Sequence, residues 1–147
     1  MALRFSTDLK NYIVNKGVVV QMAGTWGTAG TAEIKIYTGS QPASADSEAT
    51  GTLLCTIISI GWSDGVGATG GTAGLANTAG YTGTAATTGT AGWARIQRVG
   101  TGFSGSAATH RIDGDVGTAS TCTFVINSAS ITAGGTVTLL TAPVSMP

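Results

Sequence analysis

The sequence predicts an all-β fold, a β-sandwich or jelly roll with one short N-terminal helix. Short segments of β-branched and apolar residues recur along the 147-residue chain. Several of them alternate between apolar and polar positions, which is the period of a strand with one buried face. Glycine-rich stretches separate these segments, as turns separate the strands of all-β domains. The length suits a single domain.

The helix is expected near the N-terminus. Ser6 or Thr7 can serve as the N-cap residue. Leu9 and Ile13 then lie on one face, four positions apart, and Gly17 is a natural residue to end the helix. A helix of about ten residues does not persist alone in water. We therefore expect residues 1–17 to form a helical arm that packs on its own domain or on a neighbouring subunit.

The rest of the chain, residues 18–147, is predicted to form a single β-sandwich domain. Clear strand patterns cover residues 18–22, 33–37, 52–60, 93–97, 121–126 and 136–140, and weaker ones cover residues 109–112 and 130–132. Residues 52–60 are apolar on both faces, which predicts a central strand that is covered twice. Residues 61–92 are mostly Gly, Thr and Ala. They predict either a weak strand pair or a long surface loop, ordered in part by another chain.

Charge and composition exclude several classes of function. The formal net charge is zero and only 10% of residues are charged, so the basic excess that draws proteins to nucleic acids or anionic membranes is missing. No apolar run reaches the roughly 18 residues of a transmembrane helix. Cys55 and Cys122 are too few for a disulfide framework. Two buried free thiols are expected, although a single bridge stays open at this stage.

The sequence offers no convincing catalytic or metal site. Two G-x-G-x-x-G matches, at residues 65–70 and 100–105, lack the following helix that a dinucleotide site needs. Asp113-Gly114-Asp115 predicts a tight turn more strongly than a calcium loop. His110, the single histidine, has no nucleophile motif beside it. We therefore expect no enzymatic activity, no cofactor and no metal.

Three tryptophans stand beside or close to glycines. Trp93 lies inside an alternating segment, so we expect it in the core. Trp26 and Trp62 are equally compatible with core packing and with an interface, where tryptophan is enriched.

Five segments resemble, in the same order, a set of small virion proteins of tailed bacteriophages. Residues 5–11 (FSTDLKN) are similar to their "FSTxLRN" start, and residues 36–46 (IYTGSQPASAD) to their "IYTGxQPASAD" segment, which is the most specific. Residues 49–55, 88–95 and 111–118 resemble the "ATGTLLxT", "ATGTAGWxR" and "RIDGSVGT" segments. The chain departs from the pattern at Asp115 and in residues 61–86, which are shorter and richer in glycine.

The resemblance implies a head decoration, or cement, protein with a β-sandwich or jelly-roll fold. Such a protein would bind the major capsid protein on the outer surface of the phage head, after synthesis in the bacterial cytoplasm, as a dimer or trimer. We expect no nucleic-acid or membrane partner. The residues expected to contact partners are Phe5, Leu9, Tyr12, Ile13, Trp26 and Trp62.

Two other functions stay open. The chain could be a tail, baseplate or head–tail joining component of the virion. It could also be a carbohydrate-binding module, because jelly rolls host lectins.

Overall fold

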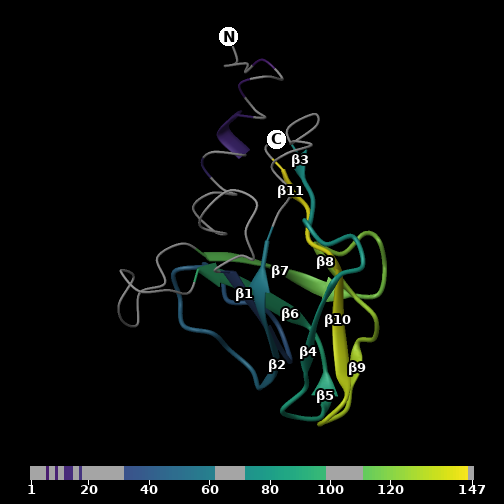
Figure 1. Cartoon of the computed structure of the whole chain (residues 1–147). Coiled ribbons are helices and arrows are strands. Elements are labelled where there is room, and N and C mark those ends of the chain that lie inside the picture. Colours follow the sequence, from purple (N-terminus) through teal and green to yellow (C-terminus); the bar gives the residue numbers. More distant parts are fainter. Residues whose placement is uncertain are drawn as a thin grey trace.

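The computed structural model describes Ser6, Leu9, residues 12–14, Gly17 and residues 32–61, 72–98 and 111–145. Its strands are β1 (Ala32–Tyr37), β2 (Leu53–Ile60), β3 (Thr72–Ala73), β4 (Tyr81–Thr84), β5 (Gly89–Thr90), β6 (Trp93–Arg98), β7 (Arg111–Gly117), β8 (Phe124–Ile126), β9 (Ser130–Ile131), β10 (Thr136–Thr141) and β11 (Val144–Ser145). The predicted all-β class is confirmed (Figure 1).

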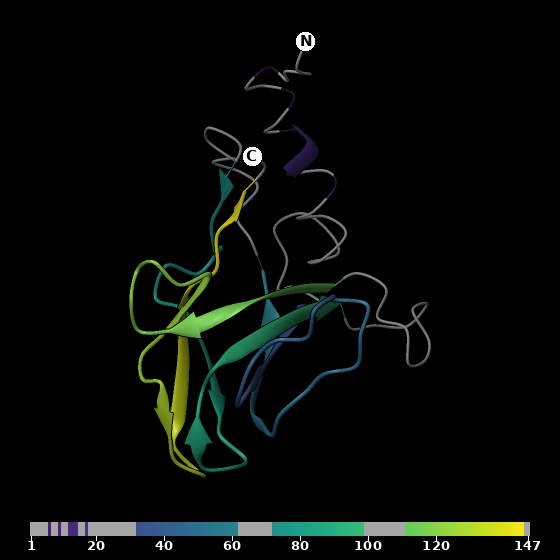
Figure 2. The ribbon, with the colours of Figure 1, turned by 180° about the vertical axis from the view of Figure 1, so that it is seen from behind.

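Seven strands form one sheet in the order β2-β1-β6-β7-β8-β10-β4. All neighbours are antiparallel except β7 and β8, which run parallel. The sheet curls until its two outermost strands meet (Figures 1 and 2), where Cys55 of β2 forms a bridge to Ala85, directly after β4. Because the amides of Ala86 and Thr87 also donate to the carbonyl of Leu54, at 2.8 and 3.3 Å, the sheet is nearly closed.

The closure depends on a glycine. A Cβ at Gly83 of β4 would lie 2.7 Å from the carbonyl oxygen of Thr56 and 2.9 Å from the side chain of Ile57. Both distances are shorter than real Cβ atoms allow. Glycine therefore lets the backbones of β2 and β4 approach where the sheet closes.

The core fills the inside of this curled sheet. Ile34 and Ile36 of β1, Ile96 of β6, Phe124 of β8 and Leu139 of β10 are all at most 1% exposed. Complete burial of such a side chain contributes about 1.5–3 kcal/mol. Burial alternates as the sequence predicts in β8 and β10, since side chains two positions apart share a face, whereas both faces of β1 and β6 are largely buried.

The predicted strands mostly coincide with observed ones. Residues 33–37, 93–97, 130–132 and 136–140 correspond to β1, β6, β9 and β10. Of residues 121–126 only the last three form a strand, β8, and residues 111–112 of the weaker 109–112 pattern begin the longer β7. In residues 72–92, short strands (β3, β4 and β5) alternate with turns, whereas residues 18–22 lie outside the described part.

The prediction for residues 52–60 is right about the strand and wrong about its place. β2 is an outermost strand of the sheet. Its register shifts between the pairs Ile34–Ile57 and Ala32–Ile60, so Ile58 and Ser59 form a bulge. Ser59 has φ of 60°, and Ile58 is 64% exposed. The bulge turns Ile58 outward, whereas the consecutive residues Leu54 and Cys55 are both fully buried.

The tight turn predicted at Asp113-Gly114-Asp115 is also wrong. These residues lie in the middle of β7, where Gly114 pairs with Ala94. A Cβ at Gly114 would lie 2.7 and 2.8 Å from side-chain atoms of Thr123. The glycine is needed for close packing of the segment that leads into β8, and not for a turn.

The two cysteines are free thiols. Cys55 is buried, and its burial raises the pKa of the thiol. Cys122 is half-buried, so the expectation of two buried thiols holds fully only for Cys55.

In the N-terminal part, the described residues are too few to define the predicted helix, which stays a prediction. The amide of Leu9 donates to Oγ of Ser6 at 3.3 Å, as in an N-cap. Among the described residues, no helix has the length and apolarity to span a membrane.

Candidate functional site

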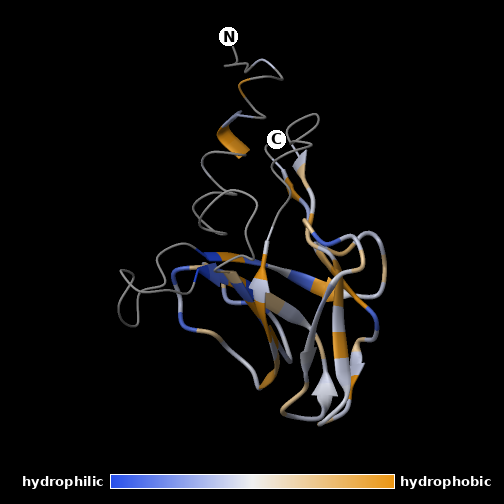
Figure 3. Ribbon diagram, viewed as in Figure 1, coloured by the Kyte–Doolittle hydropathy of each residue, from blue (hydrophilic) through white to orange (hydrophobic). Residues whose placement is uncertain are grey.

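Charge divides the described surface into two sides. The charged residues among the described ones are Glu33, Lys35, Asp46, Glu48, Arg95, Arg98, Arg111, Asp113 and Asp115. All of them lie on β1, β6, β7 or the connection from β1 to β2. Much of the hydrophilic colour in Figure 3 gathers on these elements. The strands β2 to β5 and β8 to β11 carry none. We call the first the charged side and the second the charge-free side.

On the charged side, β1, β6 and β7 place polar side chains in rows. Lys35, Arg95 and Asp113 are partners across the three strands, and Tyr37, Trp93 and Asp115 form the next row. The Tyr37 and Trp93 rings stack with their centroids 4.7 Å apart. In the remaining row, Gln97 donates to Glu33 at 2.6 Å.

The centre of this side is a buried ion pair. Nε and Nη2 of Arg95 each donate to an Asp113 carboxylate oxygen at 2.7 Å. The two side chains are only 4% and 6% exposed. The hydrogen bonds to Asp113 raise the pKa of the Arg95 guanidinium, which also lies 5.5 Å from the centre of the Trp93 ring.

Residues 38–52, which we call the strap, are held over these rows. Nε1 of Trp93 donates to the carbonyl of Thr50 at 3.2 Å, and Nη1 of Arg95 to that of Ser47 at 2.9 Å. Nη1 of Arg111 donates to the carbonyl of Ala45 at 3.2 Å. Three side chains from β6 and β7 thus fix the backbone of the strap.

Asp115 extends the polar contacts toward β8. Its Oδ1 accepts hydrogen bonds from the amide of Thr123 at 2.9 Å and from its hydroxyl at 2.5 Å. These bonds lower the pKa of the Asp115 carboxyl. The carboxylates of Asp113 and Asp115 therefore have structural partners. Among the described residues, no group of three or more histidine, cysteine, aspartate or glutamate side chains is placed to hold a metal ion.

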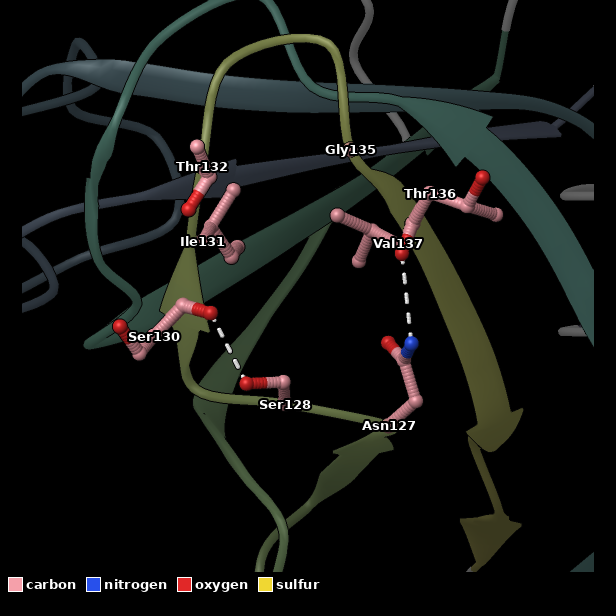
Figure 4. Close-up of a pocket in the computed structure, with 8 residues that line it drawn as sticks. All are labelled: Asn127, Ser128, Ser130, Ile131, Thr132, Gly135, Thr136 and Val137. Atoms are coloured by element: carbon pink, nitrogen blue, oxygen red, sulfur yellow. Dashed lines mark hydrogen bonds between the residues drawn. The ribbon is translucent and has the colours of Figure 1, made fainter.

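Described residues of the charge-free side line two hollows. The first, of about 190 Å³, lies between β9 and β10 and is lined mainly by hydroxyl and amide side chains (Figure 4). The Asn127 amide that borders it donates to the carbonyl of Thr136 and accepts from the amide of Thr138. Ser128 donates to the carbonyl of Ser130 at 2.8 Å. These polar groups hold adjacent backbone together.

The second hollow is an open groove of about 630 Å³, which we call the apolar groove. Leu75, Val125, Leu140, Ala142 and Pro143 form its apolar wall. Threonine, serine and asparagine side chains complete the lining, and none of the described lining residues is charged. β3 and β11 pair as a separate two-stranded antiparallel ribbon. The groove lies at the base of this β3–β11 ribbon, because residues 74–75 directly follow β3 and residues 142–143 directly precede β11.

The residues that the sequence predicts as partner contacts are only partly described. Leu9 is 43% and Tyr12 61% exposed, and Ile13 is half-buried. Phe5, Trp26 and Trp62 lie outside the described residues, as does His110. Trp93 is 1% exposed, so its predicted burial is confirmed.

The sequence analysis missed both the strap contacts and the charge-free side. The strap contacts join residues up to 66 positions apart, which no local pattern reveals. The charge-free side does leave a signal, since no charged residue follows Asp115. Depletion of charge is a property of interface cores.

The chain was compared with protein-family models, curated proteins and solved structures, and none of them matches it.

Proposed function

We propose that the chain is a bacteriophage capsid decoration protein that binds the lattice of the major capsid protein and stabilises the head. One observation carries the proposal: four of the five segments of the resemblance, including the most specific one, form one bonded unit. Residues 36–46 and 49–55 include most of the strap, and residues 88–95 and 111–118 supply the side chains that hold it. The segments that carry the resemblance thus come together in one place, the strap and the strands that hold it.

The charge-free side is the surface we assign to the capsid. Its exposed residues include Thr82, Thr84, Thr132, Thr136 and Leu140, which offer hydroxyl and apolar contacts without charges to desolvate. A small module that spans neighbouring coat subunits adds buried area across the seams of the shell. Because the sites repeat around the head, modest affinity at each site is sufficient.

The predicted arm belongs to the same proposal. Phe5, Leu9, Tyr12 and Ile13 are its partner contacts, with Trp26 and Trp62 as further anchors. The proposal also includes the finer features that the resemblance implies, namely a β-sandwich or jelly-roll arrangement and an N-terminal helix. The role is structural and requires no cofactor.

The test compares phage heads with and without the protein. Heads assembled without the chain should release their genome at a lower temperature, and addition of the purified chain should restore the original temperature. An unchanged release temperature in its absence would contradict cementing.

Two lysine variants locate the contact. Thr132→Lys places a charge on the charge-free side, and Ala43→Lys places one on the exposed strap. We expect only Thr132→Lys to weaken binding to heads. Equal binding by both variants would contradict the assignment of this side.

The alternative location in the tail or at the head–tail junction predicts a different copy number. Labelled chain in virion micrographs would appear in on the order of hundreds of copies on a decorated head, because sites repeat with the lattice symmetry. A few copies at one vertex would favour the tail or joining role instead.

A further inference from the structure

The sheet is closed by a junction between its outermost strands β2 and β4 (Figure 1), which we call the closure. Among the described residues this junction contains one isolated bridge, between Cys55 and Ala85. By contrast, β1 is joined to β2 through five residue pairs and to β6 through six. The closure therefore has much less backbone pairing than these ladders.

The ladders on the two sides of β8 are also short, with two residue pairs each, but polar side chains strengthen both. Asn127, directly after β8, accepts from the amide of Thr138 at 2.9 Å and donates to the carbonyl of Thr136. Asp115 of β7 accepts two hydrogen bonds from Thr123, directly before β8. Separation of β8 from its neighbours would break these bonds as well, so the closure is the weaker junction.

Hydrogen bonds at its two ends hold the closure together. At one end the carbonyl of Leu54 accepts from the amides of residues 86–87. At the other end the carbonyl of Gly61, directly after β2, accepts from the hydroxyl of Tyr81 at 3.2 Å and from the amide of Ala76 at 2.9 Å. Each end of the closure thus depends on a single carbonyl oxygen.

Cys55 lies at this junction and reports on its state. Its side chain is fully buried, and burial raises the pKa of its thiol. Because the thiolate is the reactive form, Cys55 should react slowly while the sheet is closed. A Cβ at Gly83 would lie 3.2 Å from the Cys55 sulfur, so the backbone of β4 lies directly against it. Movement of β4 away from β2 therefore exposes the sulfur.

We propose that the closure opens locally, by separation of β4 from β2 while β1, β6 and β7 stay paired. In the open form both outermost strands present unpaired amide and carbonyl groups, which can pair with other chains. The closed form hides these edges and shields the core. Local opening of this kind requires less free energy than global unfolding. The inference concerns the free chain and does not depend on where the protein acts.

Thiol labelling of the full chain tests the opening. Cys122→Ser leaves Cys55 as the single thiol, and its reaction with iodoacetamide is followed by intact mass in urea below the unfolding transition. We expect labelling at least about tenfold faster than the globally unfolded population allows. Its dependence on urea should be weaker, because a local opening exposes less surface. Labelling with the rate and urea dependence of global unfolding would overturn the proposal.

Tyr81→Phe, in the same Cys122→Ser background, tests whether the opening occurs at the closure. The variant removes the hydroxyl that donates to Gly61, and loss of one hydrogen bond should raise the labelling rate of Cys55 about fivefold. Tyr12→Phe is the matched control, because Tyr12 is 61% exposed, and no change is expected. Urea unfolding verifies that both variants fold. Equal labelling rates in the two variants would show that Cys55 is reached by another route and overturn the proposal.

Hydrogen exchange tests the same opening without the cysteine. The amide of Ala86 bonds across the closure to the carbonyl of Leu54 at 2.8 Å, whereas the amides of β6 lie between two ladders. We expect the Ala86 amide to exchange through frequent local opening and the β6 amides to exchange only through global unfolding. Equal protection of Ala86 and the β6 amides would contradict a local opening.

Discussion

The two sides of the curled sheet are built in opposite ways. On the charged side, a strap covers three strands and is fixed by Trp93, Arg95 and Arg111. On the charge-free side, β8, β10 and β4 carry threonine and apolar side chains, and hollows remain open. The charged residues therefore lie where the strap of the same chain covers the sheet. The surface without charges is left uncovered, which is the arrangement expected when a partner completes the fold's outer layer.

This difference assigns separate tasks to the two sides. The charged side stabilises the folded chain, because Trp93, Arg95 and Asp113 bond to groups of the same chain. The charge-free side gains little stability from within and is available for contacts with other molecules. Changes on the charged side should therefore lower stability, whereas surface changes on the other side should mainly affect association.

The largest loss of stability is expected from Asp113→Ala. The variant removes the carboxylate that pairs with the guanidinium of Arg95, and the Arg95 side chain is only 4% exposed. Removal of one partner of a buried ion pair typically costs about 3–5 kcal/mol of unfolding free energy. Urea unfolding measures it, with exposed Asp46→Ala as the control, for which a change within about 0.5 kcal/mol is expected. Equal losses of unfolding free energy in the two variants would contradict the proposed stabilising role of the charged side.

The second largest effect is expected where the sheet closes. Gly83→Ala would bring a Cβ to 2.7 Å from the carbonyl oxygen of Thr56 and force β2 and β4 apart. Overpacking of this kind costs about 1–3 kcal/mol. Gly74→Ala is the control, because a Cβ there meets nothing within 4 Å. If Gly83→Ala unfolds at the same urea concentration as Gly74→Ala, the closure contributes little to stability.

A smaller effect is expected from loosening the strap. Trp93→Phe keeps a ring against Tyr37 but removes the Nε1 donor to the carbonyl of Thr50. Loss of one such hydrogen bond costs about 1 kcal/mol, and the smaller ring in this buried position adds the cost of a small cavity. Hydrogen exchange of strap amides should accelerate more than that of β10 amides. Uniform acceleration in both regions would mean that the strap does not open independently.

The smallest effect concerns acid stability at the border between the two sides. Hydrogen bonds from Thr123 lower the pKa of Asp115 below its usual 3.8. A carboxyl with a lowered folded pKa stabilises the protein above its unfolded pKa, and this contribution disappears as pH falls through the folded pKa. Thr123→Val should raise the pKa of Asp115 and reduce the loss of stability below about pH 4. Carboxyl NMR titration measures the pKa, and an unchanged value would show that the hydroxyl contributes nothing.

The sequence predicts those parts of the fold that depend on local pattern. Alternation identifies β1 and β6, because a strand with one face inward must repeat every two residues. Gly114 shows the limit of such patterns. An aspartate–glycine pair favours a turn in isolation. Here Gly114 lies within a strand, because the close approach of Thr123 leaves no room for a side chain at this position.

The candidate site was predictable only in part. The exposure of Leu9 and Tyr12 follows from an apolar pair in a segment too short to bury itself. The apolar groove could not be predicted, because its wall combines residues 75, 125 and 140, which only the curling of the sheet brings together.

By itself the sequence determined the all-β class, the position of most strands and the absence of charge from residues 116–147, because these properties depend on composition and short-range period. Only the tertiary structure decided that β2 meets β4, that the strap covers the charged side and that the charge-free side stays open. Those features depend on contacts between residues far apart in the chain, and such contacts are chosen by packing of the whole sheet rather than by any local preference.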